Sequence, residues 1–265
     1  MSSKILFLGT AGDSMVMGKQ NRATGGIALQ AGGLNFLINP GPGSLVRAKQ
    51  YQLNLREVDI VIVTENTLLS ANDVNAVIDG MTNGGLDTKG VLACHPSVLE
   101  GTTKAYPAVS PLHKNYVEKI ITLRPQNKIA LNSVEIIPVE IKGDGYGLIV
   151  NTEGSSIGYT SNTGFSKAVA EEYAGCDVIV ICVPNVSKKS DTKLNIDDAI
   201  KFIDIAKPRL CVVTNFGTKL LETDLLSSIR LIQRETKVET IAAKEGLIID
   251  PKSYAASEKQ RRLLY

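Results

Sequence analysis

Three short, mostly apolar runs constrain this chain more than any other feature. They are VDIVIVT at 58–64, CDVIVICVP at 176–184 and RLCVVTNFG at 209–217. A strand with one face in water alternates apolar and polar side chains, and these runs leave almost no polar face. Each run is also far shorter than the roughly 20 residues of a membrane helix. The pattern therefore predicts buried strands covered on both faces, as in an α/β protein.

The segments between these runs predict further strands and helices. Strands are expected at 4–10 and 90–94, a strand pair joined at 31–33, hairpin-like pairs within 128–141 and 146–162, and a last strand pair within 238–250. Helices are expected within 70–85, 166–175, 195–207 and 222–237. Gly84 and Gly85 are expected to end the first helix, and Asn195 to cap the third.

The order of these elements predicts the architecture. Each half of the chain is rich in strands and closes with alternating strands and helices, and no Gly/Ser-rich or highly charged linker separates the halves. We therefore predict an α/β fold, a four-layer αβ/βα sandwich, formed by a single domain over residues 1–250. Residues 251–265 are predicted to form a basic C-terminal tail or a terminal helix.

Composition excludes several classes of protein. The formal net charge of +2 favours no class of partner by itself, and neither a signal peptide nor a membrane span is recognised, so a cytoplasmic protein is expected. The four cysteines form no C-x-x-C pair, which favours buried thiols over a zinc site. With only His95 and His113, a mechanism that needs several imidazoles is excluded.

A set of motifs in fixed order resembles a known family. The segments LFLGTAG, RATGGIALQAGGLNFLINPGPG, VDIVIVTEN, IGYTSNT, PRLCVVTNFG and AAKEGLIID extend from Lys4 to Asp250. Their order and spacing are similar to those of the metallo-β-lactamase superfamily, especially its ribonuclease Z-like branch. The resemblance implies the four-layer sandwich and a site at the ends of the sheets, where His and Asp residues hold one or two metal ions that activate water.

The positions where the resemblance places metal ligands carry other residues. The His-x-His-x-Asp-His segment falls on Glu65, Thr67, Leu69 and Ser70, the next His on Ile141 or Lys142, the bridging Asp on Asn162, and the last His on Asn215; Asn39 stands where an Asp is usual. Leu and Ile cannot coordinate a metal, and Asn offers only a neutral oxygen. We therefore expect a degenerate member that binds no metal, needs no cofactor and has no catalytic residue.

The remaining polar residues support two interpretations of the old site. We predict that Asn39, Asn162 and Asn215 lie close together, largely buried, and bonded to backbone or to Thr64 and Thr67. In that case amides and hydroxyls satisfy one another where a metal would sit. The alternative is a residual polar pocket that binds a small ligand.

Function is predicted from the family resemblance and from basic residues. The resemblance to RNA-processing enzymes favours a catalytically inactive binding protein, with RNA or a ribonucleoprotein such as the ribosome as partner. The candidate nucleic-acid contacts are Arg47, Lys49, Lys188, Lys189, Lys193, Lys259, Arg261 and Arg262. Two alternatives stay open: a divergent hydrolase or nuclease that uses the polar pocket, and a protein–protein scaffold subunit paired with an active relative.

Overall fold

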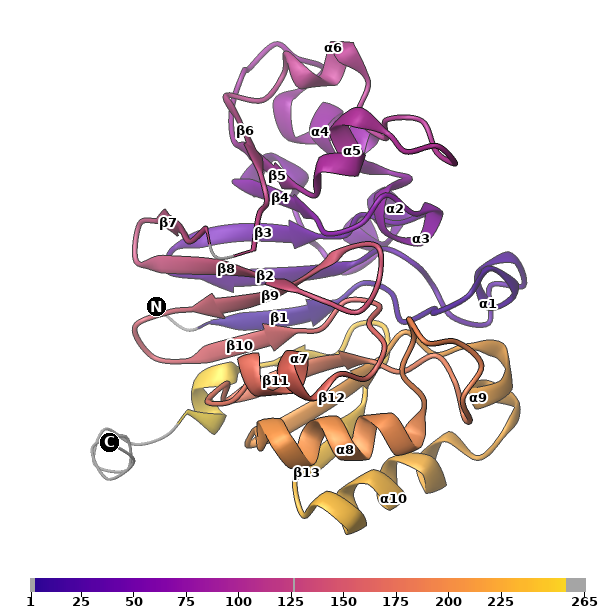
Figure 1. Ribbon diagram of the computed structural model, residues 1–265. Helices are drawn as coiled ribbons and strands as arrows, with labels where there is room; N and C mark the ends of the chain where they lie inside the picture. The colour runs from indigo at the N-terminus through magenta and orange to yellow at the C-terminus, as the bar shows by residue number, and fades with distance from the viewer. Residues whose placement is uncertain (1–2, 126, 256–265) are drawn as a thin grey trace.

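Two seven-stranded sheets form the centre of the molecule (Figure 1). The computed structural model describes residues 3–125 and 127–255. In spatial order, the first sheet contains β14 (Ile248–Ile249), β1 (Lys4–Phe7), β2 (Ile27–Ala31), β3 (Leu34–Ile38), β4 (Ile60–Val63), β5 (Val91–Cys94) and β6 (Lys119–Thr122). The second contains β13 (Glu239–Ala242), β12 (Leu210–Thr214), β11 (Val178–Cys182), β10 (Ser156–Tyr159), β9 (Tyr146–Asn151), β8 (Val134–Glu140) and β7 (Ile129–Leu131).

Short helices connect the strands and cover the outer faces of the sheets. They are α1 (Ser14–Gly18), α2 (Ser44–Gln50), α3 (Leu68–Ala71), α4 (Val74–Thr82), α5 (Pro96–Glu100), α6 (Pro111–Lys114), α7 (Lys167–Glu172), α8 (Ile196–Ala206), α9 (Thr218–Glu222) and α10 (Leu225–Thr236). Two 3₁₀ helices, Leu55–Glu57 and Pro251–Tyr254, complete the described elements. No described helix is long and apolar enough to cross a membrane.

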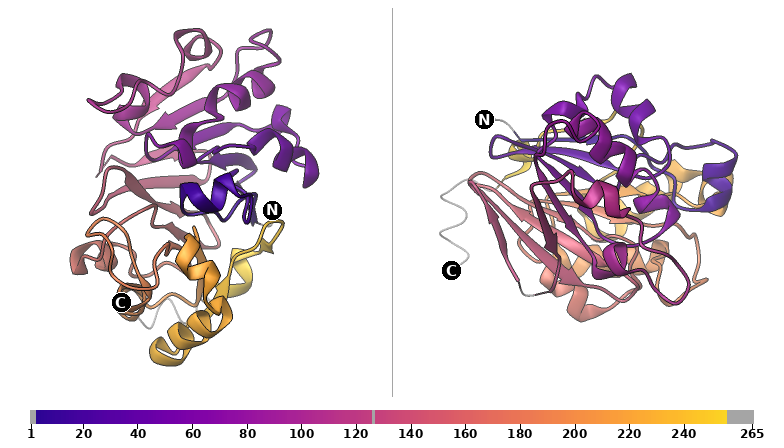
Figure 2. Two further views of the ribbon diagram at one scale, coloured as in Figure 1. Left: turned by 90° about the vertical axis from the view of Figure 1, so that its right-hand side faces the viewer. Right: turned by 90° about the horizontal axis from the view of Figure 1, so that it is seen from above.

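Three apolar cores hold four layers together. The core between the sheets takes side chains from both, such as Ile62 of β4 and Leu148 of β9. A second core joins the second sheet to α7, α8 and α10, and a third joins the first sheet to α4 and α5. In the left view of Figure 2, helices of the two chain halves lie on opposite sides of the strands. The predicted αβ/βα sandwich is confirmed.

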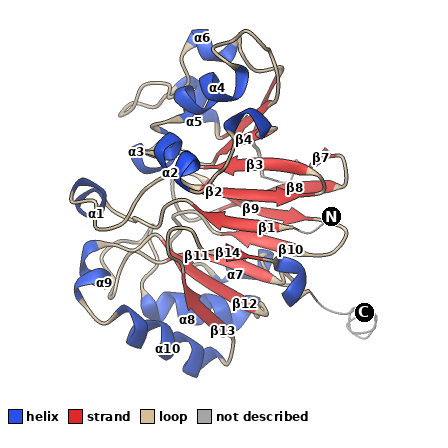
Figure 3. Cartoon of the chain, turned by 180° about the vertical axis from the view of Figure 1, so that it is seen from behind, coloured by secondary structure: helices blue, strands red, loops and turns tan. Residues whose placement is uncertain are grey.

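Parallel strands bring several turns to one end of the sandwich. β3 to β6 run parallel, as do β10 to β13. The carboxyl ends of parallel strands share one edge of a sheet, which is where α/β proteins place their sites. Helices α1, α2, α3 and α9 gather at one end of the sheets, opposite the 3₁₀ helix Pro251–Tyr254 (Figures 1 and 3).

The helix predicted within 70–85 is confirmed as α4, with Val74, Val77, Ile78 and Met81 buried as their spacing predicts, and the short helix α3 precedes it. One predicted element is wrong. The expected last strand pair does not pair with itself: β13 extends the second sheet beside β12, and β14 extends the first beside β1. Strand partners are chosen by long-range packing, which a local pattern does not contain.

Candidate functional site: a hydrogen-bonded network at the sheet ends

The candidate site lies where the turns after β3, β4, β10 and β12 meet. Residues Asn39, Thr64, Tyr159 and Asn215 come from these four places, in both sheets. The buried strands before them have their backbone groups paired in the ladders. The groups just beyond the strands need other partners, because a buried N–H or C=O without one costs free energy.

Asn39 joins the two sheets through its side-chain amide. Its Oδ1 accepts a hydrogen bond from Thr64 N at 2.8 Å, and its Nδ2 donates to Thr64 Oγ1 at 2.8 Å and to Tyr159 Oη at 3.0 Å. Thr64 Oγ1 also lies 3.1 Å from Ser161 Oγ. All four residues are buried. Asn39 has a φ of 54°, a left-handed conformation that Asn tolerates better than most residues. The amide therefore satisfies a turn and links the sheets at once.

Glu65 is a buried carboxyl with two donors on one oxygen. The residue is 6% exposed, and its Oε1 accepts hydrogen bonds from Ser70 Oγ at 2.7 Å and from Asn162 Nδ2 at 2.8 Å. Burial raises the pKa of Glu65, and the nearby Asp144 adds to that rise. The two hydrogen bonds and Lys193 act in the opposite direction on the pKa. Glu65 is thus held by neutral donors rather than by a cation.

A small cavity adjoins the network. It has a volume of about 30 Å³ and is lined by Asn39, Leu69, Ser70, Tyr159 and Asn215 together with residues of the 9–11 and 24–27 segments and Ile38. That volume holds one water molecule and no substrate. Asn215 is half-buried with a φ of 57°.

The structure brings together part of the predicted set. Glu65, Ser70 and Asn162 bond directly, while Leu69 and Asn215 line the small cavity. Asn39 bonds to Thr64 as expected, but Asn162 is half-buried and bonds to Glu65.

Thr67 and Ile141 lie outside this network. Thr67 is exposed at the start of α3, and its side chain makes no capping hydrogen bond there. Ile141 is 8% exposed and packs in the core beneath α7.

Two members of the network were missed from the sequence. Tyr159 and Ser161 lie in the IGYTSNT segment, where only Asn162 was singled out. Burial raises the pKa of Tyr159 well above its usual value, so its hydroxyl is a neutral hydrogen-bonding group. Tyr159 is the last residue of an apolar strand, and a phenol at a strand end is the signal that would have identified it.

The donor set does not fit a catalytic zinc ion. Among residues 3–125 and 127–255, no group of three or more His, Cys, Asp or Glu side chains could hold a metal. Asn162 presents its Nδ2, a hydrogen-bond donor, to the one carboxylate, and Leu69 and Ile141 are apolar. Zinc sites in proteins are built from thiolate, imidazole and carboxylate ligands, with at least three from the protein.

The basic residues occupy two described places near this end of the molecule. Arg47 and Lys49 lie on α2. The segment between β11 and α8 carries Lys188, Lys189 and Lys193. This segment packs closely on Gly164, because a side chain at position 164 would clash with the Asp191 carbonyl.

Their charges are only partly neutralised. Lys188 is exposed and pairs with Asp191, with 2.9 Å between Nζ and Oδ1, and Lys193 lies near enough to Glu65 to affect its pKa. Lys259, Arg261 and Arg262 lie outside the described residues.

Comparison with known proteins places the fold. Residues 34–216 match the family model described as a β-lactamase superfamily domain. A protein of Methanocaldococcus jannaschii, described as uncharacterized, is 27% identical over 259 residues, which cover 94% of this chain and 96% of that protein.

Solved structures share the whole architecture at low identity. The metallo-β-lactamase fold protein YhfI from Bacillus subtilis has a TM-score of 0.77 at 15% identity. The match covers 94% of this chain and 99% of that chain. The short form of human tRNase Z has a TM-score of 0.68 at 11% identity, with 98% of that chain and 93% of this one covered. Identities at this level establish the shared fold.

Proposed function

Because this chain belongs to the metallo-β-lactamase superfamily, and because its side chains bond to one another where metal ligands are expected, we propose that it is a catalytically inactive member that acts by binding. The partner we propose is RNA or a ribonucleoprotein such as the ribosome, met in the cytoplasm. The observation that carries the proposal is the Ser70–Glu65–Asn162 arrangement, in which the one carboxyl of the site is engaged by two neutral donors.

The chemistry of this arrangement supports inactivity. A hydrolytic metal site keeps an open coordination position for water, held by ligands whose lone pairs face the metal. Here Ser70 and Asn162 direct donor groups at Glu65, and the adjoining cavity has room for about one water. Ser70 Oγ donates to Glu65 Oε1 at 2.7 Å, as a nucleophile does to its base, but both residues are buried beside a cavity that holds about one water, so a substrate does not reach the pair.

An RNA partner is supported by charge placement. Lys188, Lys189 and Lys193 lie on the segment that packs against the turn carrying Asn162, and Arg47 lies on α2 at the same end of the sheets (Figure 1). Lysines near a rigid turn make contacts to phosphates that do not depend on base sequence. The tRNase Z neighbour is named for an RNA substrate, and the same fold supplies the scaffold here.

A protein partner is the second candidate, and exposed apolar residues favour it. Met15 on α1, Val46 on α2 and Leu68 on α3 are 56%, 69% and 53% exposed. The three helices gather at one end of the molecule (Figure 1). Exposed apolar side chains that cluster are typical of protein-binding surfaces.

The RNA proposal is tested by binding to single-stranded RNA at two or more salt concentrations. Replacing Lys188, Lys189 and Lys193 by Glu should weaken binding by more than about tenfold and lower the salt dependence, because each lost phosphate contact removes about 0.7 from the slope of log K against log salt. The matched control replaces Lys4, Lys119 and Lys237, which are exposed at other places on the surface.

Two results would oppose this function. If the two triple variants bind RNA equally well, the lysines near Asn162 are not the contact. If the purified chain, prepared without chelators, contains near-stoichiometric zinc, manganese or iron by elemental analysis, the inactive-site interpretation is wrong. Pull-downs with and without nuclease distinguish an RNA-dependent partner from a protein bound directly.

A further inference from the structure

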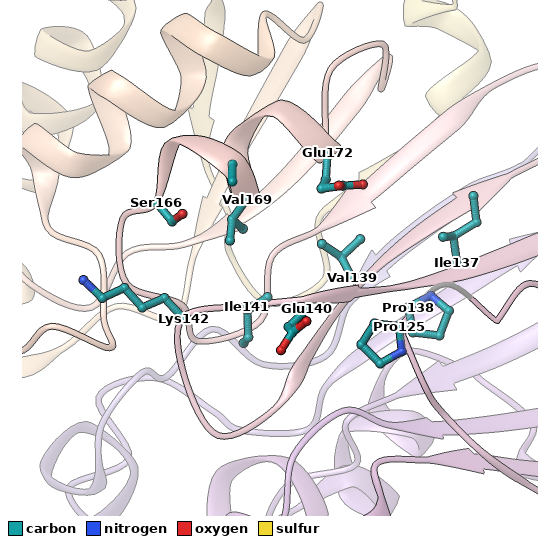
Figure 4. A pocket seen from close by; sticks show the side chains of 11 residues that line it. Pro125, Ile137, Pro138, Val139, Glu140, Ile141, Lys142, Ser166, Val169 and Glu172 are labelled. Atoms are coloured by element: carbon teal, nitrogen blue, oxygen red, sulfur yellow. The ribbon is translucent and has the colours of Figure 1, made fainter.

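A groove runs along the second sheet, away from the network described above. It has a volume of about 460 Å³ and lies between α7 and the β8 strand. Figure 4 shows Ile137, Val139 and Val169 around its apolar part, with Glu140 and Glu172 at its rim. Both glutamates are exposed.

One wall of the groove is an open sheet edge. β7 is the outermost strand of its sheet, yet its three residues pair only with Val134 to Ile136 of β8. The second half of β8 pairs with β9 on its other side and has no strand beside it on this side among the described residues. An unpaired edge presents free N–H and C=O groups to any extended chain that reaches it.

The register shows which backbone groups face outward. Leu131 and Val134 flank the two-residue turn of the β7–β8 hairpin, and residues in that position exchange hydrogen bonds. The direction of the backbone groups alternates along a strand. Those of Val134, Ile136, Pro138 and Glu140 therefore point away from β9. Neither Pro138 O nor Glu140 N has a hydrogen-bond partner within the described ranges.

Pro138 explains both the end of β7 and the limit of the edge. A proline has no N–H, so a strand cannot continue its antiparallel ladder past this residue. The C=O of Pro138 and the N–H of Glu140 remain. In a parallel ladder, one residue of the added strand donates its N–H to the first of these groups and accepts from the second.

We propose that this groove binds an extended peptide segment of another protein, added parallel to β8 with one residue opposite Val139. The N–H of that residue donates to Pro138 O, and its C=O accepts from Glu140 N. Since directly opposed side chains point to the same face of a sheet, its side chain enters the apolar part of the groove beside Val139 and Val169.

The charges at the rim specify the neighbouring residues. The next residue of the peptide lies opposite Glu140, and the residue two positions before the apolar one points toward α7, where Glu172 stands. Opposite charges across strands stabilise pairing, and like charges oppose it. The groove therefore fits a segment with the pattern basic–any–apolar–basic. In this kind of β-strand addition, backbone hydrogen bonds supply affinity and side-chain contacts supply sequence specificity.

The test uses the peptide Lys-Ala-Val-Lys-Ser-amide, which begins opposite Ile137 because Ile129 of β7 already lies opposite Ile136, with the full-length, isotope-labelled chain. We expect peptide-dependent shifts of the Glu140 amide signal in nitrogen–proton correlation spectra at concentrations up to about 1 mM. N-methylvaline in place of valine replaces the bonding N–H by a methyl group and should weaken binding by at least about tenfold. A peptide with Glu in place of both Lys should bind more weakly still.

A matched pair of variants checks the orientation. Glu172→Lys should lower affinity for the basic peptide about tenfold and favour the acidic one. Glu171→Lys changes the neighbouring residue, which is exposed and lies within 3.6 Å of Lys167, and should leave binding unchanged. Equal binding of the N-methylated peptide, equal effects of the two variants, or no shift of Glu140 with any peptide would overturn the proposal. So would self-association that protects the Glu140 amide without peptide, which would assign the groove to a second copy.

Discussion

Replacing Asn162 by Asp tests whether the network at the sheet ends is complete without a cation. In the native chain Asn162 Nδ2 donates to Glu65 Oε1 at 2.8 Å. Asn162→Asp turns this donor into an acceptor and places a second carboxylate against a buried one. The change keeps the size and shape of the side chain, so its effect is electrostatic.

The magnitude follows from two contributions. A hydrogen bond to a charged group contributes about 1.5–3 kcal/mol, and this bond is lost. Two carboxylates in contact cannot both be ionised without cost, so the pKa of the pair rises, at about 1.4 kcal/mol for each unit. Because the site is partly open at Asn162, we expect a total loss of about 2–4 kcal/mol in the free energy of unfolding at neutral pH.

Urea unfolding at neutral pH, in the presence of a chelator, measures this loss. Asn162→Ala is the control, since it removes the hydrogen bond and adds no charge. A carboxyl whose pKa is raised in the folded state destabilises the fold above its unfolded pKa, and the destabilisation disappears as pH falls through the folded pKa. The gap between the Asp and Ala variants should therefore narrow from about pH 7 to about pH 5.

Two results would refute this reasoning. If Asn162→Asp is as stable as the native chain at pH 7 in chelator, the carboxylates are solvated and the network is not closed. If zinc or manganese ions stabilise the native chain in the same assay, a cation completes the site, and the donor contacts of Ser70 and Asn162 do not describe its working state.

Three further predictions use the same residues or the thiols. Glu65→Gln should gain stability relative to the native chain between about pH 4 and pH 7 in urea titrations. Burial raises the folded-state pKa of Glu65, so the native chain loses stability as pH rises through that range. Parallel plots of stability against pH for the two chains would contradict this. Asn39→Ala should cost about 2–4 kcal/mol in thermal melts, because Thr64 N loses its acceptor, and Asn39→Gly controls for the left-handed backbone; equal stability of all three chains would refute the bridge. All four cysteines are buried, and burial raises the pKa of Cys94 to about 12 and of Cys176 to about 11, so Ellman's reagent at about pH 8 should react only after unfolding; rapid reaction of the folded chain would show otherwise.

The layers of this fold were predictable because they follow from local patterns. The strands β4, β11 and β12, which are apolar apart from Thr214 at the end of β12, are buried on both faces, as their sequences predict. The tight turn after Ala31 was predictable as well, since Gly32 and Gly33 both have positive φ. The partner of β14 was not predictable, because β14 is a two-residue strand and its neighbour β1 lies at the other end of the chain.

The site divides in the same way. Its positions could be placed by resemblance, because turns that follow strands keep their order along the chain. Its bonds could not, since they join residues such as Thr64 and Ser161 that are 97 positions apart. Whether an amide presents its oxygen or its nitrogen depends on the partner it meets. Asn39 offers Oδ1 to a backbone N–H, whereas Asn162 offers Nδ2 to a carboxyl.

This contrast indicates what each amide does at the sheet ends. Asn39 fulfils a need of the backbone, because Thr64 N would be buried without an acceptor, and any fold with this turn has that need. Asn162 donates a hydrogen bond to the buried carboxyl of Glu65. Glu65→Gln would remove the charge of that carboxyl and retain an oxygen that accepts from Ser70. Glu65 is therefore the one residue of the network whose charge the fold does not require. If Glu65→Gln leaves the fold intact and more stable at neutral pH but weakens binding of RNA, the carboxyl serves the partner rather than the architecture.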